Sequence, residues 1–452
     1  ARIFKTYGSL SVEVLERDPY RLAQEVDGIG FITADTIAFA SGWEKNSFAR
    51  IAAGLSYELS QISSSGHCCI PESVLADRSA QRLGVARSEV MEVLAHEVKT
   101  QRLYHVDELG ERLIYAPYLY QAEEKTARTL RLLQKKAEHI YVDDADLLVA
   151  EWEVKSSVTL AAAQREAVTA ALTHGVFVLT GGPGTGKTTV IRSMIDILGA
   201  EGLEILLGAP TGRAAKRLAE ATGHPAVTVH RMLEAQGGTQ GQIRFARDDK
   251  TPLEADVIIL DEVSMMDIVL TQHFLTAVLP GTHVILVGDV DQLPAVGPGA
   301  VLKDILRAEV IPSVRLTEIF RQDSTGTIVL NAHAINAGRI PSFTAEDFSF
   351  LPAVSSEDAA QQIVSLCQDL LLRKNDVSIM DVQVLSPMRR EACGVDILNL
   401  RLQAALNPPG RGKEEVAGLR IGDKVMQTQN DYTKGVFNGD IGRITWIDTE
   451  HI

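Results

Sequence analysis

Short apolar runs alternate with amphipathic segments from about Ser156 to the end of the chain. The apolar runs have the length of buried strands, and the segments between them repeat their apolar positions with helical spacing. We interpret five runs as strands, at 176–180, 205–208, 257–260, 283–287 and 382–385. This alternation predicts an α/β fold with a mostly parallel sheet covered on both faces.

The pattern before Ser156 is different. Residues 1 to about 120 read as helices interrupted by short turns, and 121–155 read as a charged helical connector with a solvated face. A helix in the second α/β region is expected to carry Val395, Leu398 and Leu402 on one face and to end at Asn407. The chain is therefore expected to consist of a mainly α-helical region followed by an α/β region.

Composition narrows the class of protein. A chain of 452 residues is long enough for roughly three domains. Its apolar runs are strand-sized and no secretory signal opens it, so we expect neither a membrane span nor export. The start at Ala1 inside a predicted helix suggests that the natural N-terminus lies further upstream. The four cysteines show no zinc spacing and are interpreted as reduced thiols of a cytoplasmic protein.

The formal net charge of −15 argues against a protein whose whole surface attracts a polyanion. It leaves room for a local nucleic-acid track, because a few Arg, Lys and backbone amides are sufficient for one. Net charge alone therefore argues slightly against DNA as a binding partner, so the assignment depends on the sequence motifs.

The segment 181–189, GGPGTGKTT, fits the phosphate-loop pattern G-x-x-x-x-G-K-[ST] without a gap. It follows a predicted strand and opens a predicted helix at 187–198, which is the context that this motif requires. Backbone amides of such a loop surround a triphosphate, while Lys187 reaches its β- and γ-phosphates and Thr188 ligates Mg²⁺. The predicted ATP-binding residues are Gly182, Pro183, Gly184, Thr185, Gly186, Lys187, Thr188 and Thr189. The alternative is a chance glycine-rich turn.

Two further polar groups follow predicted strands. Asp261 and Glu262 come directly after 257–260, where Asp261 fits a magnesium ligand and Glu262 fits the base that orients an attacking water. Gln292 lies in the Pro- and Gly-rich segment 288–299 and is placed to sense the γ-phosphate. A solvated strand end and a plain connecting loop are the alternatives.

The ordered motifs resemble those of superfamily 1 DNA helicases, and most closely those of the RecD-like branch with a long N-terminus. The motifs that carry the resemblance are GGPGTGKTT at 181–189, APTGRAAKRL at 209–218, TVHRML at 228–233, LDEVSMMD at 260–267, GDVDQLPAVGPG at 288–299, LTEIFRQ at 316–322, SPMRR at 386–390, GDKVMQTQNDY at 422–432 and VFNGDIGRI at 436–444.

The resemblance implies roles for further residues. Gln164 would read adenine, and Arg321 would reach the γ-phosphate from a second motor lobe, although an ion pair with Glu318 is the alternative for Arg321. Pro210, Thr211 and His230 fall on motifs that contact single-stranded DNA in the family. We add Pro294, Val296, Arg389 and Asn430 to the expected DNA contacts.

Two more segments have a counterpart in the family. Turn residues around a short alternating run at 237–250 predict a β-hairpin, which in RecD-like enzymes acts as a pin at the duplex junction. Residues 26–38 fit half of a helix-hairpin-helix, in which Gly28 and Gly30 would bring backbone amides to a DNA phosphate. A tight turn without function is the alternative for these glycines.

The resemblance implies the following division: a helix-hairpin-helix at 1–44, a helical accessory domain at 45–120, a helical connector at 121–155, a RecA-like motor lobe at 156–312 and an incomplete second lobe at 313–452. The chain is expected to end before the small β-barrel insertion of the family and its last motifs. The implied activity is ATP- and Mg²⁺-dependent 5′-to-3′ movement on single-stranded DNA and at duplex junctions, in repair or recombination.

Three alternatives stay open. One is a P-loop kinase or ATPase that acts on another substrate. The second is an ATP-gated DNA-binding module that recruits protein partners through its N-terminal region. The third is a subunit of an exonuclease complex that does not unwind DNA by itself.

Overall fold

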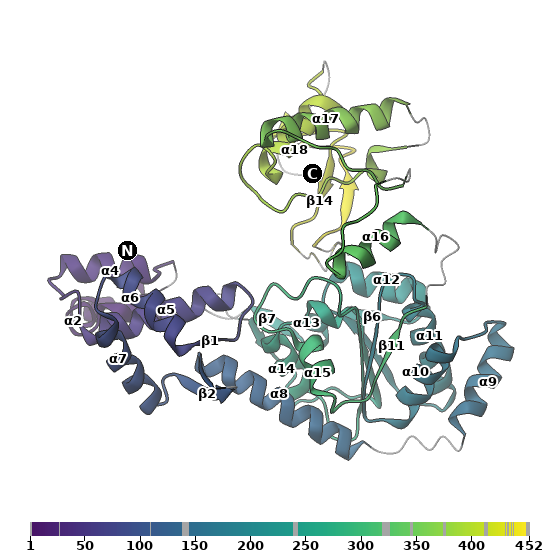
Figure 1. Cartoon of the computed structure of the whole chain (residues 1–452), viewed down its shortest axis with the longest axis horizontal. Coiled ribbons are helices and arrows are strands. Elements are labelled where there is room, and N and C mark those ends of the chain that lie inside the picture. Colours follow the sequence, from purple (N-terminus) through teal and green to yellow (C-terminus); the bar gives the residue numbers. More distant parts are fainter. Residues whose placement is uncertain are drawn as a thin grey trace. The chain divides into compact units, whose positions relative to one another are not determined.

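The computed structural model describes residues 2–26, 28–108, 110–137, 144–237, 243–318, 326–343, 347–373, 377–410, 415–429, 431, 434, 436 and 438–448. Two compact units make up the chain (Figure 1). The first comprises Ala1–Pro210 and Ala214–Phe320, and the second comprises Thr211–Arg213 and Arg321–Ile452.

A six-stranded parallel sheet forms the centre of the first unit. Its strands are, in spatial order, β11 (Ser313–Leu316), β4 (Val176–Gly181), β10 (His283–Gly288), β9 (Val257–Leu260), β5 (Ile205–Ala209) and β6 (Ala226–Thr228). Every residue of β4, β9 and β10 is buried. The structure thus confirms the parallel α/β architecture.

Alternate residues of β4 face two separate cores. Val176 and Val178 belong to one hydrophobic cluster, whereas Phe177 and Leu179 belong to the other. This is the period of two expected of a strand whose sheet is covered on both faces. The helices of the first cluster are α8 (Pro117–Lys136), α13 (Val229–Met232), α14 (Ile268–Thr276) and α15 (Val301–Ala308) (Figure 1). Those of the second are α9 (Ala145–Ser156), α10 (Ala162–Thr173), α11 (Lys187–Ala200) and α12 (Gly212–Thr222) (Figure 1).

Neither edge strand of this sheet was predicted from the sequence. β6 and β11 are only three and four residues long, so their apolar runs are too short to stand out. Because β11 pairs with β4 in the first sheet, the predicted start of the second lobe at residue 313 is wrong. The first unit extends to Phe320.

The predicted connector is part of the core. In α8, Leu119, Ala122, Leu130 and Leu133 are buried, and the helix packs along α14. Most of the charged positions that suggested a solvated helix, such as Glu124, Lys125 and Arg128, occupy its outer face, whereas Glu123 is partly buried. Burying apolar side chains on one face of a long helix stabilises its position on the sheet.

The N-terminal region has its own hydrophobic core. A three-stranded antiparallel sheet, which the sequence did not predict, joins the helices there, with β3 (Glu111–Tyr115) between β1 (Cys69–Pro71) and β2 (Tyr104–Glu108). The helices of the region are α1 (Arg2–Tyr7), α2 (Ser11–Arg17), α3 (Leu22–Glu25), α4 (Phe31–Ala40), α5 (Phe48–Ser64), α6 (Glu72–Leu83) and α7 (Arg87–Lys99), with 3₁₀ turns η1 (Gly8–Leu10) and η2 (Pro19–Arg21).

Within its described residues, the second unit contains helices and two short antiparallel ladders. The pairs are β12 (Glu415–Val416) with β13 (Leu419–Arg420) and β14 (Lys424–Met426) with β15 (Ile441–Arg443). Its helices are α16 (Thr327–Asn336), α17 (Ser356–Arg373), α18 (Val395–Leu406) and the 3₁₀ turn η5 (Ile379–Asp381). The predicted helix ending at Asn407 is confirmed by α18.

The predicted strand at 382–385 is wrong. These residues adopt no strand, and the Leu385 side chain is 87% exposed. Among the described residues of the second unit no parallel pair of strands occurs, so a RecA-like second lobe stays a prediction. A search of the same described residues finds no helix with both the length and the apolar composition of a membrane span.

Candidate active site

The phosphate loop joins the end of β4 to the first turn of α11. Gly184 and Gly186 have φ angles of 79° and 83°, a backbone conformation that favours glycine. A Cβ atom on Gly181 would lie 2.7 Å from Thr185 Oγ1 and 3.0 Å from Leu316 Cβ. Glycines at these positions therefore permit both the turns of the loop and its close approach to β11.

The Lys187 ammonium lies on the loop itself. Its Nζ atom donates to the Gly181 carbonyl at 2.6 Å and to the Gly182 carbonyl at 3.0 Å. The Thr185 hydroxyl also donates to the Gly182 carbonyl, at 2.9 Å. The charge of Lys187 is thus held at the mouth of the loop, where an incoming phosphate oxygen can replace the carbonyls.

Gln164 is buried beside this loop, with 5% of its surface exposed. Its Nε2 donates to the Thr185 carbonyl at 3.1 Å, and its Oε1 accepts from the Ala161 amide at 3.0 Å. The side chain therefore ties the start of α10 to the phosphate loop. Its expected adenine contact stays a prediction.

Asp261 and Glu262 directly follow the last residue of β9. Because all six strands are parallel, this end of β9 lies at the same sheet edge as the phosphate loop. The Glu262 amide donates to Asp261 Oδ1 at 2.8 Å. Burial raises the pKa of the Asp261 carboxyl, and the Lys187 charge opposes this rise. Burial, and next the neighbouring Asp261, raise the pKa of Glu262, while Lys187 and Arg217 act to lower it.

Glu262 adopts a left-handed backbone conformation, with φ 56° and ψ 37°. Such a conformation costs roughly 1–3 kcal/mol for a residue other than glycine, and it is most often retained at functional sites. Here it turns the chain from β9 into η4 (Val263–Met265).

Asp289, which the sequence analysis did not single out, is buried at the end of β10. Its Oδ1 accepts from the Asp291 amide at 3.0 Å, and its charge contributes to the raised pKa of Glu262. Its position two residues after the predicted strand 283–287 was the available signal. Gln292 follows in the same loop with an exposed side chain, and Asp291 forms an ion pair with Arg315 at 2.6 Å.

His230 lies half-buried on α13, where burial lowers the pKa of its imidazole. Its ring is 5.8 Å from the Phe245 ring, which in turn is 4.8 Å from that of His273. Phe245 belongs to β8 (Ile243–Phe245), which pairs antiparallel with β7 (Ala235–Gly237). The predicted hairpin is therefore confirmed at its base, whereas 238–242 lie outside the described residues.

The other predicted residues are distributed over both units. Pro210 is half-buried after β5, while Pro294 and Val296 are exposed in the loop after β10. Thr211 and the exposed Arg389 belong to the second unit. Arg321 and Asn430 lie outside the described residues.

Gly28 and Gly30 form an exposed turn between α3 and α4. Gly28 has a φ of 75°, and a Cβ atom there would meet the guanidinium of Arg2. This turn therefore requires glycine and carries a positive charge beside it.

The donors around the phosphate loop suit ATP with a magnesium ion. Oxygen ligands from a hydroxyl and a carboxylate, as in Thr188 and Asp261, are those that Mg²⁺ prefers, with the phosphates providing others. No cluster of three or more His, Cys, Asp or Glu side chains suited to a metal is found within the described ranges.

Three family models match the chain. Residues 1–69 match the ATP-dependent RecD2 DNA helicase HHH domain, 159–353 match an AAA domain, and 398–452 match the ATP-dependent RecD-like DNA helicase SH3 domain. The last match corrects our expectation that the chain ends before the small β-barrel of the family.

The chain is 35% identical to the ATP-dependent RecD2 DNA helicase of Deinococcus radiodurans, over 98% of this chain and 61% of that protein. It is 34% identical to the RecBCD enzyme subunit RecD of Mycobacterium tuberculosis, over 62% of this chain and 54% of the relative. A solved structure of Pif1 helicases at forked DNA aligns with 64% of this chain and 72% of its own, at 21% identity and a TM-score of 0.38, which adds nothing to the fold argument.

The chain spans about three fifths of the Deinococcus relative and about half of the Mycobacterium one. The matches include the N-terminal region, the parallel-sheet motor region and the C-terminal segment, in the order that the motifs predicted. The chain belongs to the RecD-like family of superfamily 1 helicases.

Proposed function

We propose that this chain is the motor portion of an ATP-dependent DNA helicase that moves 5′ to 3′ along single-stranded DNA during repair or recombination. The observation that supports this most directly is the placement of the phosphate loop and the Asp261–Glu262 pair at one edge of a parallel sheet. The similarity of the chain to the ATP-dependent RecD2 DNA helicase of Deinococcus radiodurans supports the same activity. We also propose that the protein works in the cytoplasm.

In this proposal Lys187 leaves the loop carbonyls and pairs with the β- and γ-phosphates of ATP. Thr188 and Asp261 hold Mg²⁺, which supplies positive charge to the phosphate oxygens when bound. Glu262 accepts a proton from the attacking water, and Gln292 senses the presence of the γ-phosphate. Arg321 stabilises charge on the transferring phosphoryl group, and its loss is expected to cost on the order of 10³-fold in turnover.

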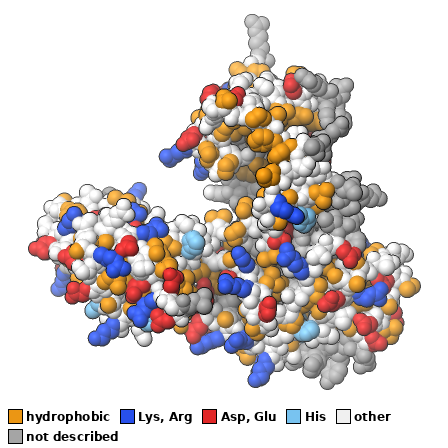
Figure 2. Space-filling model, viewed as in Figure 1, with side chains coloured by type: hydrophobic (Ala, Val, Ile, Leu, Met, Phe, Trp, Pro, Cys, Tyr) orange, Lys and Arg blue, Asp and Glu red, His pale blue; other side chains and the backbone are white. Residues whose placement is uncertain are grey.

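DNA contacts in the proposal come from local groups, because the net charge is −15 and acidic and basic side chains are interspersed on the face in Figure 2. Such contacts require only positioned amides, hydroxyls and single charges. The proposed groups are Pro210, Thr211, His230, Pro294, Val296, Arg389 and Asn430, with Gly28 and Gly30 on duplex phosphates. Protein partners of the N-terminal region are proposed as well.

The test is ATP hydrolysis by the chain with and without single-stranded DNA, followed by unwinding of 5′-tailed and 3′-tailed duplexes. We expect strong stimulation by DNA and unwinding of the 5′-tailed duplex. Hydrolysis indifferent to DNA would indicate an ATPase with another substrate. ATP-dependent DNA binding without phosphate release would indicate the gated binding module instead.

The hairpin of β7 and β8 is proposed as the pin that separates the duplex. Its base is fixed by the Phe245 ring and by the ion pair of Arg247 with Glu234 at 2.7 Å. Deleting residues 238–249 should spare DNA-stimulated hydrolysis and abolish unwinding. Equal loss of both activities would contradict the assignment.

A further inference from the structure

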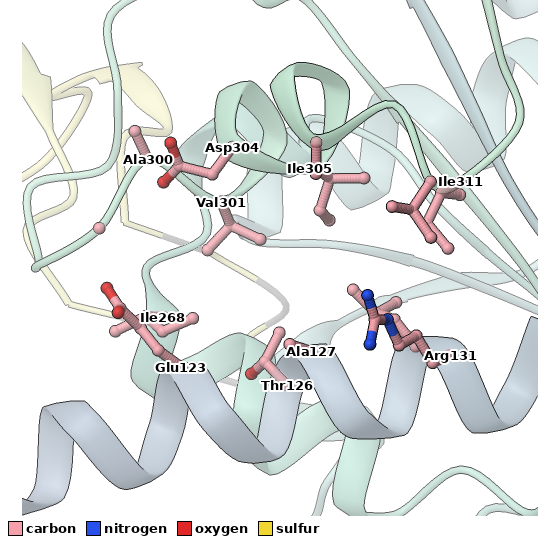
Figure 3. Close-up of a pocket in the computed structure, with 14 residues that line it drawn as sticks. Glu123, Thr126, Ala127, Arg131, Ile268, Ala300, Val301, Asp304, Ile305 and Ile311 are labelled. Carbon is pink, nitrogen blue, oxygen red and sulfur yellow. The ribbon is translucent and has the colours of Figure 1, made fainter. Parts of the chain in front are cut away.

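A pocket of about 340 Å³ lies between α8 and α15, apart from the phosphate loop (Figure 3). This volume is at the lower end of the range of small-molecule sites, roughly 300–1,000 Å³. Most of its wall is hydrocarbon, from Ala127, Leu130, Ile268, Val301, Ile305 and Ile311. The proposed motor cycle uses none of these side chains.

The polar groups of the pocket are separated by sign. The Glu123 carboxyl on α8 and the Asp304 carboxyl on α15 lie at one end, and Arg131 lies towards the other end (Figure 3). Arg131 is the only basic side chain among the described residues that line the pocket. The end formed by Glu123 and Asp304 is therefore acidic, with no basic lining residue beside it.

The Cys68 thiol and the Tyr115 hydroxyl are close enough to the Glu123 carboxyl to oppose the rise of its pKa on burial. Burial raises the pKa of Glu123, and the charges of Asp304 and Glu108 add to the rise. Burial also raises the pKa of Asp304, although Arg307 and Lys303 on its own helix act to lower it. Neither Arg307 nor Lys303 lines the pocket. A positive group at this end would offset the repulsion between the carboxylates.

The pocket adjoins the loop that follows β10. Gly299 and Ala300 line it, and the Gly299 amide donates to the Gly66 carbonyl at 3.0 Å. A Cβ atom on Gly299 would lie 3.2 Å from Cys68 Sγ. A bound molecule would therefore contact α8, α15 and the end of the loop that carries Gln292.

We propose that this pocket binds a small organic cation with an apolar body. Its ammonium or guanidinium group lies between the Glu123 and Asp304 carboxylates, and its hydrocarbon part packs on Ile268, Val301 and Ile305. Charge-assisted hydrogen bonds favour a cation at the acidic end, and apolar burial favours a hydrocarbon body over a hydrated metal ion. The volume of about 340 Å³ suits a free small molecule.

The test is isothermal titration calorimetry of the full chain with 4-phenylbutylammonium as the probe. Near-isosteric 4-phenylbutanol and the anion 4-phenylbutyrate are the comparison ligands. We expect saturable binding of the amine at one site, with both comparison ligands at least about 10-fold weaker, because only the amine forms charge-assisted bonds. Absence of saturable amine binding, or equal affinity for the alcohol, would overturn the proposal.

Variants locate the site. The double variant Glu123→Gln with Asp304→Asn should weaken amine binding at least about 10-fold and leave binding of the alcohol unchanged. Glu124→Gln is the matched control, because Glu124 is an exposed acid on the same helix that pairs with Arg128. Thermal melting checks that each variant is folded, and the comparison of amine with alcohol on the unaltered chain requires no variant. Full amine affinity in the folded double variant would contradict the assignment.

Discussion

Two pairs of carboxyl groups in the first unit differ in what surrounds them. Asp261 and Glu262 are neighbours in sequence and lie near the Lys187 charge. Glu123 and Asp304 come from separate helices and face a hydrocarbon wall. Burial raises the pKa of all four groups. A raised pKa therefore does not distinguish the two sites. Only the groups around each pair indicate whether magnesium-bound ATP or an organic cation suits it.

The largest expected effect comes from removing the Lys187 charge that lies near the first pair, Asp261 and Glu262. Lys187→Ala should reduce DNA-stimulated ATP hydrolysis by about 10²–10³-fold, because a preorganised positive group on the phosphates is lost. Phosphate release measures it, with the exposed Lys155→Ala on α9 as the control. Near-normal turnover in Lys187→Ala would remove the phosphate loop from the mechanism.

The same substitution in both pairs makes the comparison direct. Glu262→Gln should lower turnover by about 10²–10⁴-fold, because it removes the proposed base while keeping the shape of the side chain. Glu123→Gln should change turnover by less than about 2-fold, since it lies outside the proposed chemistry. Single-turnover hydrolysis, together with nucleotide binding, distinguishes lost chemistry from lost affinity. Similar losses in the two variants would make the distinction between the pairs untenable.

The pH dependence of turnover sharpens the assignment of Glu262. A base must be ionised to accept a proton, and the pKa of Glu262 is raised above that of an ordinary glutamate. Turnover should therefore fall on the acid side at a pH above the ordinary glutamate pKa. The residual activity of Glu262→Gln should lack this acid limb. An unchanged limb in that variant would assign the titration to another group.

The smallest expected effect concerns stability at the second pair. Because the folded-state pKa of Glu123 is raised, its ionised form destabilises the fold, so its contribution is favourable at low pH and is lost as the pH rises through the raised value. The melting temperature of Glu123→Gln minus that of the unaltered chain should thus be a few degrees larger in mildly alkaline buffer than in acid. Thermal melting across pH measures this. A constant difference between the two proteins at every pH would contradict the expected titration.

The sequence predicts the first pair because its determinants are local. A buried apolar run, a following acidic pair and the phosphate-loop spacing are all visible within short windows. Four of the five predicted strands form for the same reason. The left-handed conformation of Glu262 and the burial of Asp289 could not be predicted, because both depend on strands that are distant in sequence.

The second pair shows why the rest was missed. Glu123 lies in a segment whose charges suggest a solvated helix, and only the packing of α8 on α14 reveals that its other face is buried. The Phe245 contact with His230 and His273 likewise joins three separate elements. The strand predicted at 382–385 is wrong for the opposite reason. A short apolar run there suggested a strand, but such a run carries no information about whether a pairing strand is present.

The pairing of β11 with β4 has a mechanical consequence. Leu316 is in register with Gly181, and the two backbones approach so closely that a Cβ atom on Gly181 would lie 3.0 Å from the Leu316 carbonyl oxygen. Tight packing of this kind transmits small displacements instead of absorbing them. The strand that contacts the phosphate loop is also the edge strand of the sheet, so it is held by β4 alone among the strands. A shift of that loop by a fraction of an ångström would therefore be passed directly to β11, the last strand of the first unit in chain order.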